Sequence, residues 1–312
     1  MTDDTDKAPL TELLTVRDWL RFATSRFRAA GLTFGHGTAS ALDEAAFLVL
    51  ETLHLPIDQL EPWLDARLTT PERASVLDII ERRIATRKPA SYLTGTAYIQ
   101  GLRFVVDERV IVPRSFIGEL IATGRLDEML SQAPSQVLDL CTGSGCLAIL
   151  AALRFPDARV DAVELSRGAI EVAHNNIRDH GVGDRVSVLP GDLLAPVAGR
   201  RYDLIIANPP YVAAAEVVAF TPEYAAEPVM AHIGGSDGLD LVRRILAEAG
   251  NHLESAGALV MEIGTGRAII EAEYPHLPFL WLDTETSEGE VLMIGAAELS
   301  DQKPGRRKPA RN

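Results

Sequence analysis

The chain has 312 residues, a hydrophobic fraction of 47% and a net charge of −14. This length accommodates two domains, and the acidic balance excludes broad, nonspecific binding of nucleic acid. No apolar run is long enough to cross a membrane, and the acidic residues 1–6 lack the features of a signal peptide, so we expect a cytoplasmic protein without membrane contact. Cys141 and Cys146 have no second Cys or His pair beside them, so no metal site is expected.

Residues 1–90 show the pattern of a helical domain. Residues that cap helices precede apolar segments with helical spacing, and Pro71 stands in a first turn, where proline is tolerated. The expected helices cover residues 15–30, 40–54 and 70–86. The third helix ends in a group of cations that complement its dipole: Arg82, Arg83, Arg87 and Lys88. We expect this domain, which carries no catalytic motif, to recognise the substrate.

Pro89 begins a segment of different character. Turn residues and short apolar runs follow each other here, and residues 109–112 form a β-branched run that indicates a strand. We therefore expect a hairpin at residues 96–112, within a linker that spans residues 91–114.

Strands and helices alternate along residues 115–300, which predicts a parallel sheet with helices on both faces. A helix at about 116–130 precedes this alternation. The predicted strands are 136–140, 159–164, 185–190, 202–207, 257–263, 278–283 and 290–296. The predicted helices are 146–155, 166–180, 239–254 and 265–272. The loop before the final strand is too short for a crossover helix, so that strand is expected to be antiparallel.

Residues 208–211, Asn-Pro-Pro-Tyr, follow the predicted strand 202–207 and end it. Prolines cannot donate ladder hydrogen bonds and have a fixed φ, so these residues form a stiff turn. The side-chain amide, a free carbonyl and the aromatic ring suit a flat neutral group with N–H donors, such as an amide or an exocyclic amine. The predicted catalytic residues are Asn208, Pro209 and Tyr211. The predicted substrate-binding residues are Asn208, Pro209, Pro210 and Tyr211.

A glycine-rich loop follows the strand at 136–140. Gly143 and Gly145 allow a sharp turn and the close approach of a ligand, and with Ala148 they match the dinucleotide fingerprint. Asp139 precedes the loop, where a carboxylate would repel a pyrophosphate but would suit a cationic sulfonium. The residues of this motif that are predicted to bind the cofactor are Asp139, Cys141, Thr142, Gly143 and Gly145.

Acidic residues also follow the next two predicted strands. Glu164 is placed to accept hydrogen bonds from ribose hydroxyls, and Asp192 is placed to reach an adenine amino group, with Leu193 against the ring. Such sheets bind ligands at the carboxyl ends of their strands, where Asn208 is also predicted to contact the cofactor. This combination favours S-adenosylmethionine over a nicotinamide cofactor.

These motifs resemble those of the bacterial protein-(glutamine-N5) methyltransferases. The resemblance extends from Tyr92 to the last strand, and it implies a class I S-adenosylmethionine-dependent methyltransferase fold: an α/β domain with a seven-stranded, mostly parallel sheet at 115–300, after an N-terminal helical domain. Residues 113–120 and the glycine-rich loop are similar to the branch that methylates a glutamine in large-subunit ribosomal protein L-three. The alternative branch, which acts on peptide chain release factors, usually has a proline at the place of Ser115.

Two other interpretations stay open on the residues alone. An NAD-dependent oxidoreductase would explain the glycine-rich loop and Glu164, but it gives residues 208–211 no role. A DNA adenine methyltransferase would explain that turn, but it would need a basic recognition region, and this chain is acidic.

Two further segments carry expectations about partners. Residues 212–238 are long for a connection between a strand and a helix, so we expect them to cover the substrate glutamine. Residues 301–312 contain five cations and little apolar surface, so we expect a disordered basic tail with weak contact to rRNA.

Overall fold

The computed structural model describes residues 8–300, which form two compact units. The first, here called the helical unit, comprises residues 8–98, 105–113 and 220–227. The second, the sheet unit, comprises residues 99–104, 114–219 and 228–300. The predicted basic tail at 301–312 lies outside the described residues, as do residues 1–7.

Capping side chains set the helix starts of the helical unit. Thr15 accepts a hydrogen bond from the Asp18 N–H at the start of α2 (Val16–Ala29), and the Asp18 carboxylate accepts one from the Thr15 N–H. Trp19, Ala23 and Phe27 are fully buried, and their spacing of four residues lines one face of α2. The predictions of three helices are confirmed. They are α2, α3 (Ala41–Thr52) and α4 (Thr70–Thr86). The helical unit also contains α1 (Ala8–Glu12), η2 (Glu61–Trp63), α5 (Ala90–Thr94) and α10 (Pro222–Ala225).

The hairpin after the helices is shorter than the predicted one. Its strands are β1 (Thr96–Ile99) and β2 (Leu102–Val105). The prediction of a strand at 109–112 was wrong. The Val110 N–H is engaged in a turn, and the Val110 carbonyl accepts a hydrogen bond from the Tyr92 hydroxyl at 2.5 Å. These contacts use the backbone groups that a strand ladder would require.

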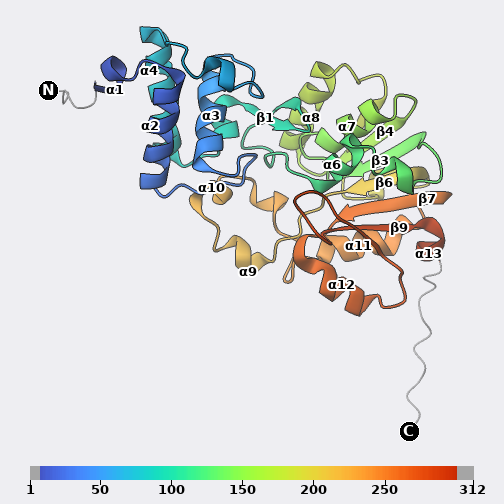
Figure 1. Ribbon diagram of the computed structural model, residues 1–312. Helices are drawn as coiled ribbons and strands as arrows, with labels where there is room; N and C mark the ends of the chain where they lie inside the picture. The colour runs from blue at the N-terminus through green and yellow to red at the C-terminus, as the bar shows by residue number, and fades with distance from the viewer. Residues whose placement is uncertain (1–7, 301–312) are drawn as a thin grey trace. The chain divides into compact units, whose positions relative to one another are not determined.

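The sheet unit contains a seven-stranded sheet in the order β5-β4-β3-β6-β7-β9-β8 (Figure 1). Neighbours from β5 to β7 pair in parallel, whereas β9 is antiparallel to both β7 and β8. The predicted sheet and its antiparallel end are confirmed. The strands are β3 (Gln136–Leu140), β4 (Arg159–Glu164), β5 (Val186–Pro190), β6 (Tyr202–Ala207), β7 (Leu253–Glu262), β8 (Leu280–Leu282) and β9 (Val291–Gly295).

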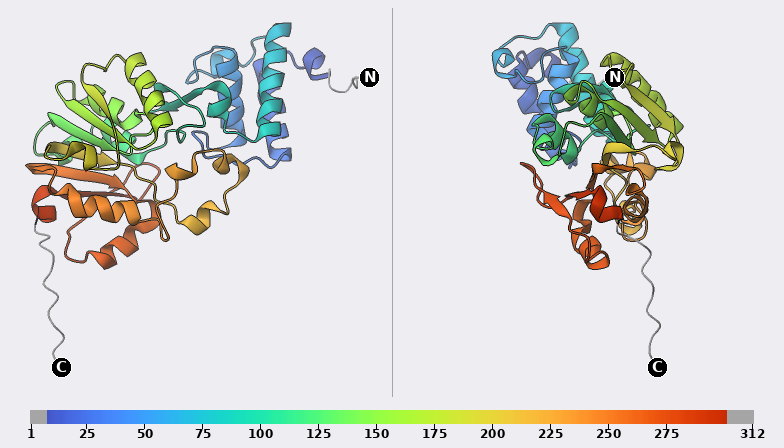
Figure 2. Two further views of the ribbon diagram at one scale, coloured as in Figure 1. Left: turned by 180° about the vertical axis from the view of Figure 1, so that it is seen from behind. Right: turned by 90° about the vertical axis from the view of Figure 1, so that its right-hand side faces the viewer.

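Helices cover both faces of this sheet (Figures 1 and 2). Side chains alternate along β6, so Leu204 and Ile206 join the core under α7, while Ile205 and Ala207 join the core under α11. The first face carries α6 (Phe116–Ala122), α7 (Cys146–Arg154) and α8 (Arg167–Asp179). The second carries α11 (Asp240–Ala249), α12 (Arg267–Glu273) and α13 (Ala296–Ser300). Shorter elements are η3 (Asp127–Met129), η4 (Ala195–Val197), α9 (Ala214–Val217), η5 (Val229–Ala231) and η6 (Gly264–Gly266).

Two helices are shorter than the sequence indicated. The helix predicted to reach residue 130 ends at Ala122, and Gly124 just beyond it has φ +78°, outside the right-handed helical region. The helix predicted to reach residue 254 ends at Ala249, and Leu253 already begins β7.

Candidate active site

Strands that are distant in the sequence end side by side at the carboxyl edge of the sheet. Leu140 of β3 pairs with Val163 of β4 and with Ala207 of β6, and Ala207 pairs in turn with Met261 of β7. The next residue of each chain segment falls in one row across the sheet: Glu164, Cys141, Asn208 and Glu262. Three of these four were predicted as site residues, and the register brings them together.

The Asn-Pro-Pro-Tyr turn presents two acceptors. Asn208 is partly buried, and within residues 8–300 no hydrogen bond engages its side-chain amide or the Pro209 carbonyl. The Tyr211 ring packs on Gly264, where a Cβ would stand 2.8 Å from two ring carbons. Burial, together with the nearby Glu262 carboxylate, raises the pKa of Tyr211, so its hydroxyl stays protonated at neutral pH. The turn therefore offers a stiff, ring-bounded place for a donor group.

A second, glycine-rich segment holds this turn in place. The Gly234 N–H donates to the Val212 carbonyl at 2.9 Å, and the Val212 N–H donates to the His232 carbonyl at 2.9 Å. A Cβ on Gly238, which has φ +84°, would stand 2.3 Å from the Tyr211 carbonyl oxygen. Only glycine allows this close approach of one backbone to the other. The residues around 234–238 thus fix the path of the chain directly after Asn208.

The loop between β3 and α7 is built on Asp139. This residue is fully buried, and its Oδ2 accepts hydrogen bonds from the Thr142 hydroxyl at 2.5 Å and from the Ala148 N–H at 3.0 Å. Within the described part of the chain, its Oδ1 is buried without a hydrogen bond. Burial raises the pKa of Asp139 to about 7, against the effect of those two donors. Gly143 has φ +57° and open space where a Cβ would be, so the loop leaves room beside it.

Glu164 ties the glycine-rich loop to the end of β4. Its Oε2 accepts a hydrogen bond from the Gly143 N–H at 2.9 Å, and its Oε1 accepts one from the Ser166 N–H at 2.8 Å. Each carboxylate oxygen has a further lone pair, so these contacts leave acceptor capacity for a ligand hydroxyl. Cys141, at φ +59°, is the residue where the loop turns. Burial raises the pKa of its thiol, which makes it a poor nucleophile.

Asp192 lies on the wall of a cavity of about 520 Å³ at the same edge of the sheet. Its carboxylate forms an ion pair with Arg244 at 2.7 Å, and both side chains are roughly half exposed. Leu165, with 59% of its surface exposed, and Met230, with 50% exposed, also line this cavity. Leu193, by contrast, is buried against the core at φ +46°. The cavity thus combines exposed apolar side chains with two acidic residues, Asp192 and Asp240.

Sequence reasoning missed Glu262, which ends β7 beside Asn208. It is fully buried, and it accepts hydrogen bonds from the Ser115 hydroxyl and from the Phe116 and Ile117 N–H groups at the start of α6. Burial raises the pKa of Glu262 to about 7, against the effect of these donors. The signal was available in the sequence, because an acid that follows an apolar strand is the criterion that had singled out Asp139 and Glu164.

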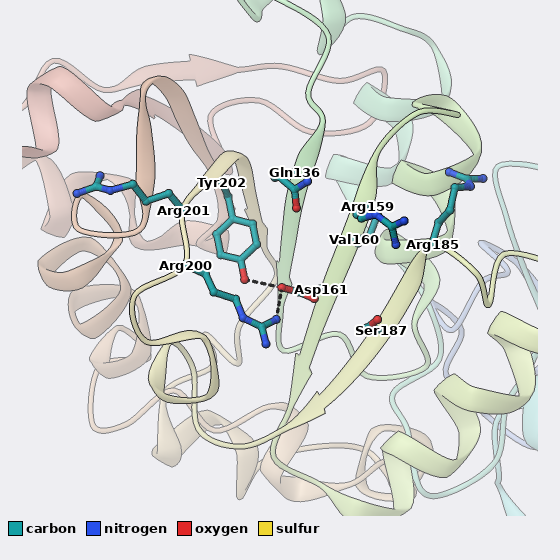
Figure 3. Close-up of a pocket in the computed structure, with 9 residues that line it drawn as sticks. All are labelled: Gln136, Arg159, Val160, Asp161, Arg185, Ser187, Arg200, Arg201 and Tyr202. Atoms are coloured by element: carbon teal, nitrogen blue, oxygen red, sulfur yellow. Dashed lines mark hydrogen bonds and ion pairs between the residues drawn. The ribbon is translucent and has the colours of Figure 1, made fainter.

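A further cavity, of about 310 Å³, lies at the opposite edge of the sheet (Figure 3). It is lined by residues that begin β3, β4, β5 and β6, and it contains several arginines. Asp161 at its centre accepts hydrogen bonds from Arg200 and from the Tyr202 hydroxyl, both at 2.7 Å. Ligands of parallel sheets bind at the carboxyl ends of the strands, whereas this cavity lies at their amino ends. We therefore do not assign the candidate active site to it.

Between residues 8 and 300, no three His, Cys, Asp or Glu side chains are grouped to hold a metal ion. Over the same residues, no helix combines the length and the apolar character that crossing a bilayer requires.

Comparison with known proteins gives the chain its family. Residues 121–223 match the family model of the Methyltransferase small domain. The chain is 54% identical over 295 residues to the ribosomal protein uL3 glutamine methyltransferase of Bradyrhizobium diazoefficiens, covering 92% of both chains. It is 52% identical over 297 residues to the protein of the same name from Burkholderia pseudomallei, covering 93% of this chain and 97% of that one.

Solved structures show the same fold at low sequence identity. The hMettl16 catalytic domain, in complex with a MAT2A 3'UTR hairpin, superposes with a TM-score of 0.50 at 15% identity, covering 72% of this chain and 82% of that chain. The carboxyl-edge site thus lies in a methyltransferase fold. The sequence of the whole chain is more than half identical to that of a curated relative over nearly its full length. The chain belongs to the family of ribosomal protein uL3 glutamine methyltransferases.

Proposed function

We propose that this protein transfers the methyl group of S-adenosylmethionine to the side-chain amide nitrogen of a glutamine in ribosomal protein uL3, in the cytoplasm. The observation that carries the proposal is the acceptor turn. Asn208 and Pro209 offer two oxygens that accept no hydrogen bond from residues 8–300. They lie at the same edge of the sheet as the glycine-rich loop between β3 and α7, in a chain whose relatives are named for this activity. The weak rRNA contact expected of residues 301–312 stays a prediction.

The residues around the glycine-rich loop fit this cofactor. The Asp139 Oδ1 is a buried acceptor without a partner among the described residues, and the space beside Gly143 is open. Glu164 keeps lone pairs that could accept hydrogen bonds from ribose hydroxyls. The cavity beside Asp192 combines exposed apolar surface with a carboxylate, which suits an adenine ring and its amino group. When bound, S-adenosylmethionine supplies a methyl group made electrophilic by the positive sulfonium.

The acceptor turn compensates for the low reactivity of the substrate. An amide nitrogen is a weak nucleophile because its lone pair is delocalised into the carbonyl. Asn208 Oδ1 and the Pro209 carbonyl each accept one N–H of the glutamine amide, which aims the nitrogen and favours the positive charge that develops on it. Tyr211 packs against the amide plane. Positioning and fixed acceptor dipoles therefore supply most of the catalysis. In the transfer, the nitrogen would gain the methyl group as the bond from that methyl to sulfur breaks, the donor would leave as a neutral thioether, and the nitrogen would release one proton to water.

Three alternatives receive less support. The release-factor branch shares the acceptor turn, but six relatives at 50–54% identity are named for uL3. Neither an oxidoreductase nor a DNA methyltransferase accounts for those relatives, and an oxidoreductase also leaves residues 208–211 without a role.

The proposal is tested by incubating the purified protein with cofactor carrying a labelled methyl group and with purified uL3 or, separately, a release factor. The expected result is label in uL3, on a glutamine identified by mass spectrometry, and none in the release factor. Label in the release factor alone would move the protein to the other branch.

A further inference from the structure

The connection between β6 and α11 passes through both units. It starts at the acceptor turn, residues 208–211, and it ends at the glycine-rich segment 234–238, and both ends belong to the sheet unit. Its middle, residues 220–227 with α10, belongs by its contacts to the helical unit. A connection of this kind ordinarily runs over the surface. Here its middle carries two acidic side chains, Glu223 and Glu227, that are fully buried.

Glu223 is held by cations from the end of α4. Its Oε1 lies 2.7 Å from Arg87 Nη2 and 3.6 Å from Arg83 Nη1, and it accepts a hydrogen bond from the Thr33 N–H at 3.2 Å. The Arg83 side chain is completely buried, and its Nε donates to Glu44 at 2.7 Å. The prediction that these arginines complement the helix dipole therefore missed their main role, which is to pair with buried carboxylates.

Glu227 is held by a second set of contacts within the same unit. Its Oε1 accepts a hydrogen bond from the Val112 N–H at 2.9 Å, and its Oε2 lies 3.7 Å from His36 Nε2. The His36 ring in turn packs against the Tyr224 ring at a centroid distance of 4.2 Å. Gly35 has φ +124°, and a Cβ there would stand 2.6 Å from the Tyr224 hydroxyl. Residues 223–227 are thus enclosed by polar partners with defined geometry.

Buried carboxylates of this kind specify one arrangement. Acidic side chains are almost never fully buried unless they are paired, and removing one partner leaves an uncompensated charge. A slip of the loop by one residue would remove Glu223 from Arg87 and Glu227 from the Val112 N–H. An apolar contact of the same size would tolerate such a slip, because it lacks direction. The contacts therefore fix the position of the loop along its length.

We propose that Glu223 and Glu227 are positioning residues that anchor the middle of the β6–α11 connection, so that the acceptor turn at its start keeps the path it needs to hold a protein substrate. This inference rests on the proposed function, because it ties the loop to the turn that holds the protein substrate. Asn208 remains the residue that touches the reacting amide. Glu223 acts through the loop and contacts neither substrate nor cofactor.

The test compares Glu223→Gln with Glu216→Gln. Glu216 lies on α9 in the same connection, but it is exposed and belongs to the sheet unit. Hydrogen–deuterium exchange is measured first, without substrate. Glu223→Gln is expected to speed exchange about tenfold in peptides from residues 212–219 and 228–233, and to leave β3 to β6 unchanged. Glu216→Gln is expected to match the wild type.

Kinetics supply the second readout. Glu223→Gln is expected to lower kcat/KM for uL3 by about tenfold or more, while the Kd for S-adenosylhomocysteine stays within about twofold of the wild type. Arg87→Lys keeps a cation beside Glu223, so it is expected to retain most of kcat/KM. If Glu223→Gln does not fold, Arg87→Ala takes its place as the disruptive variant, and Arg87→Lys is compared with it. In that comparison, the anchor is supported if Arg87→Lys shows an exchange rate and a kcat/KM that both lie between those of Arg87→Ala and those of the wild type.

Unchanged exchange in the loop of Glu223→Gln would overturn the inference. So would an equal loss of cofactor affinity and of uL3 turnover, because that pattern indicates general damage to the fold. The exchange experiment does not depend on the substrate. If the wild type fails to methylate uL3 while loop exchange still responds to Glu223→Gln, the proposed function fails and the anchor stands.

Discussion

Gly234 packs against the backbone of Pro210: a Cβ built on Gly234 would stand 2.5 Å from the Pro210 carbonyl oxygen and 2.1 Å from that of Gly238. This contact between backbones, with no side chain between them, keeps the acceptor turn against the segment that returns to α11. It makes the turn sensitive to a single added methyl group.

Gly234→Ala is therefore expected to displace the turn and to lower kcat for uL3 methylation by about a hundredfold, because catalysis by positioning tolerates little displacement. Cofactor affinity, measured by calorimetry, should change little. Gly183→Ala is the matched control, since the nearest atom to its Cβ would be 3.7 Å away, at ordinary contact distance. Equal turnover in the two variants would show that the contact at Gly234 does not position the turn.

Asp192 provides a separate test of the cofactor site. If its carboxylate accepts a hydrogen bond from the adenine amino group, Asp192→Ala should weaken binding of S-adenosylhomocysteine about tenfold, the size of one such interaction. Arg244→Ala should not weaken it, because Arg244 competes for the same carboxylate. Asp184→Ala, an exposed acid just before the amino end of β5, is the control. Identical affinities for Asp192→Ala and Asp184→Ala would remove Asp192 from the site.

The raised pKa of Glu262 predicts that the stability of the folded protein depends on pH. This pKa is about 7 in the folded protein, against an ordinary value of 4.5, so between these values the folded state holds a proton that the unfolded state has released. The contribution of Glu262 to the free energy of unfolding therefore falls as pH rises from about 4.5 to about 7, by up to roughly 3 kcal/mol.

Glu262→Gln cannot titrate, so the comparison isolates this group from the other acids. The wild type should lose stability relative to Glu262→Gln as pH rises through that window, as measured by urea unfolding at several pH values. Asp139, whose pKa is also raised to about 7, affects both proteins alike. A stability difference that is independent of pH would show that Glu262 titrates normally.

Much of the sheet unit could be predicted because its signals are local. Apolar runs of β-branched residues gave the strands, and the short loop before the final strand gave its antiparallel direction. The carboxyl-edge residues were predictable for the same reason, since topology places strand ends together. At residues 109–112 the same pattern failed, because a β-branched run there is used in a turn that binds the Tyr92 hydroxyl.

The partners of buried charges could not be predicted, since they depend on contacts between distant parts of the chain. Ser115 and Glu262 are 147 residues apart in the sequence, and Val112 and Glu227 are 115 apart. Neither spacing nor composition indicates such a pair. The sequence pattern at Arg83 is that of any helix end, and only the packing of α4 shows that its guanidinium is completely buried.

The most direct test of the account is the turnover of Asn208→Ala on uL3. The variant should bind S-adenosylhomocysteine with a Kd within about twofold of the wild type, since Asn208 contributes mainly to the acceptor side. Its kcat should fall by about a hundredfold or more, the usual cost of removing one fixed dipole from a transition state. Methylation of uL3 by Asn208→Ala at the wild-type rate would contradict the proposed role of the acceptor turn.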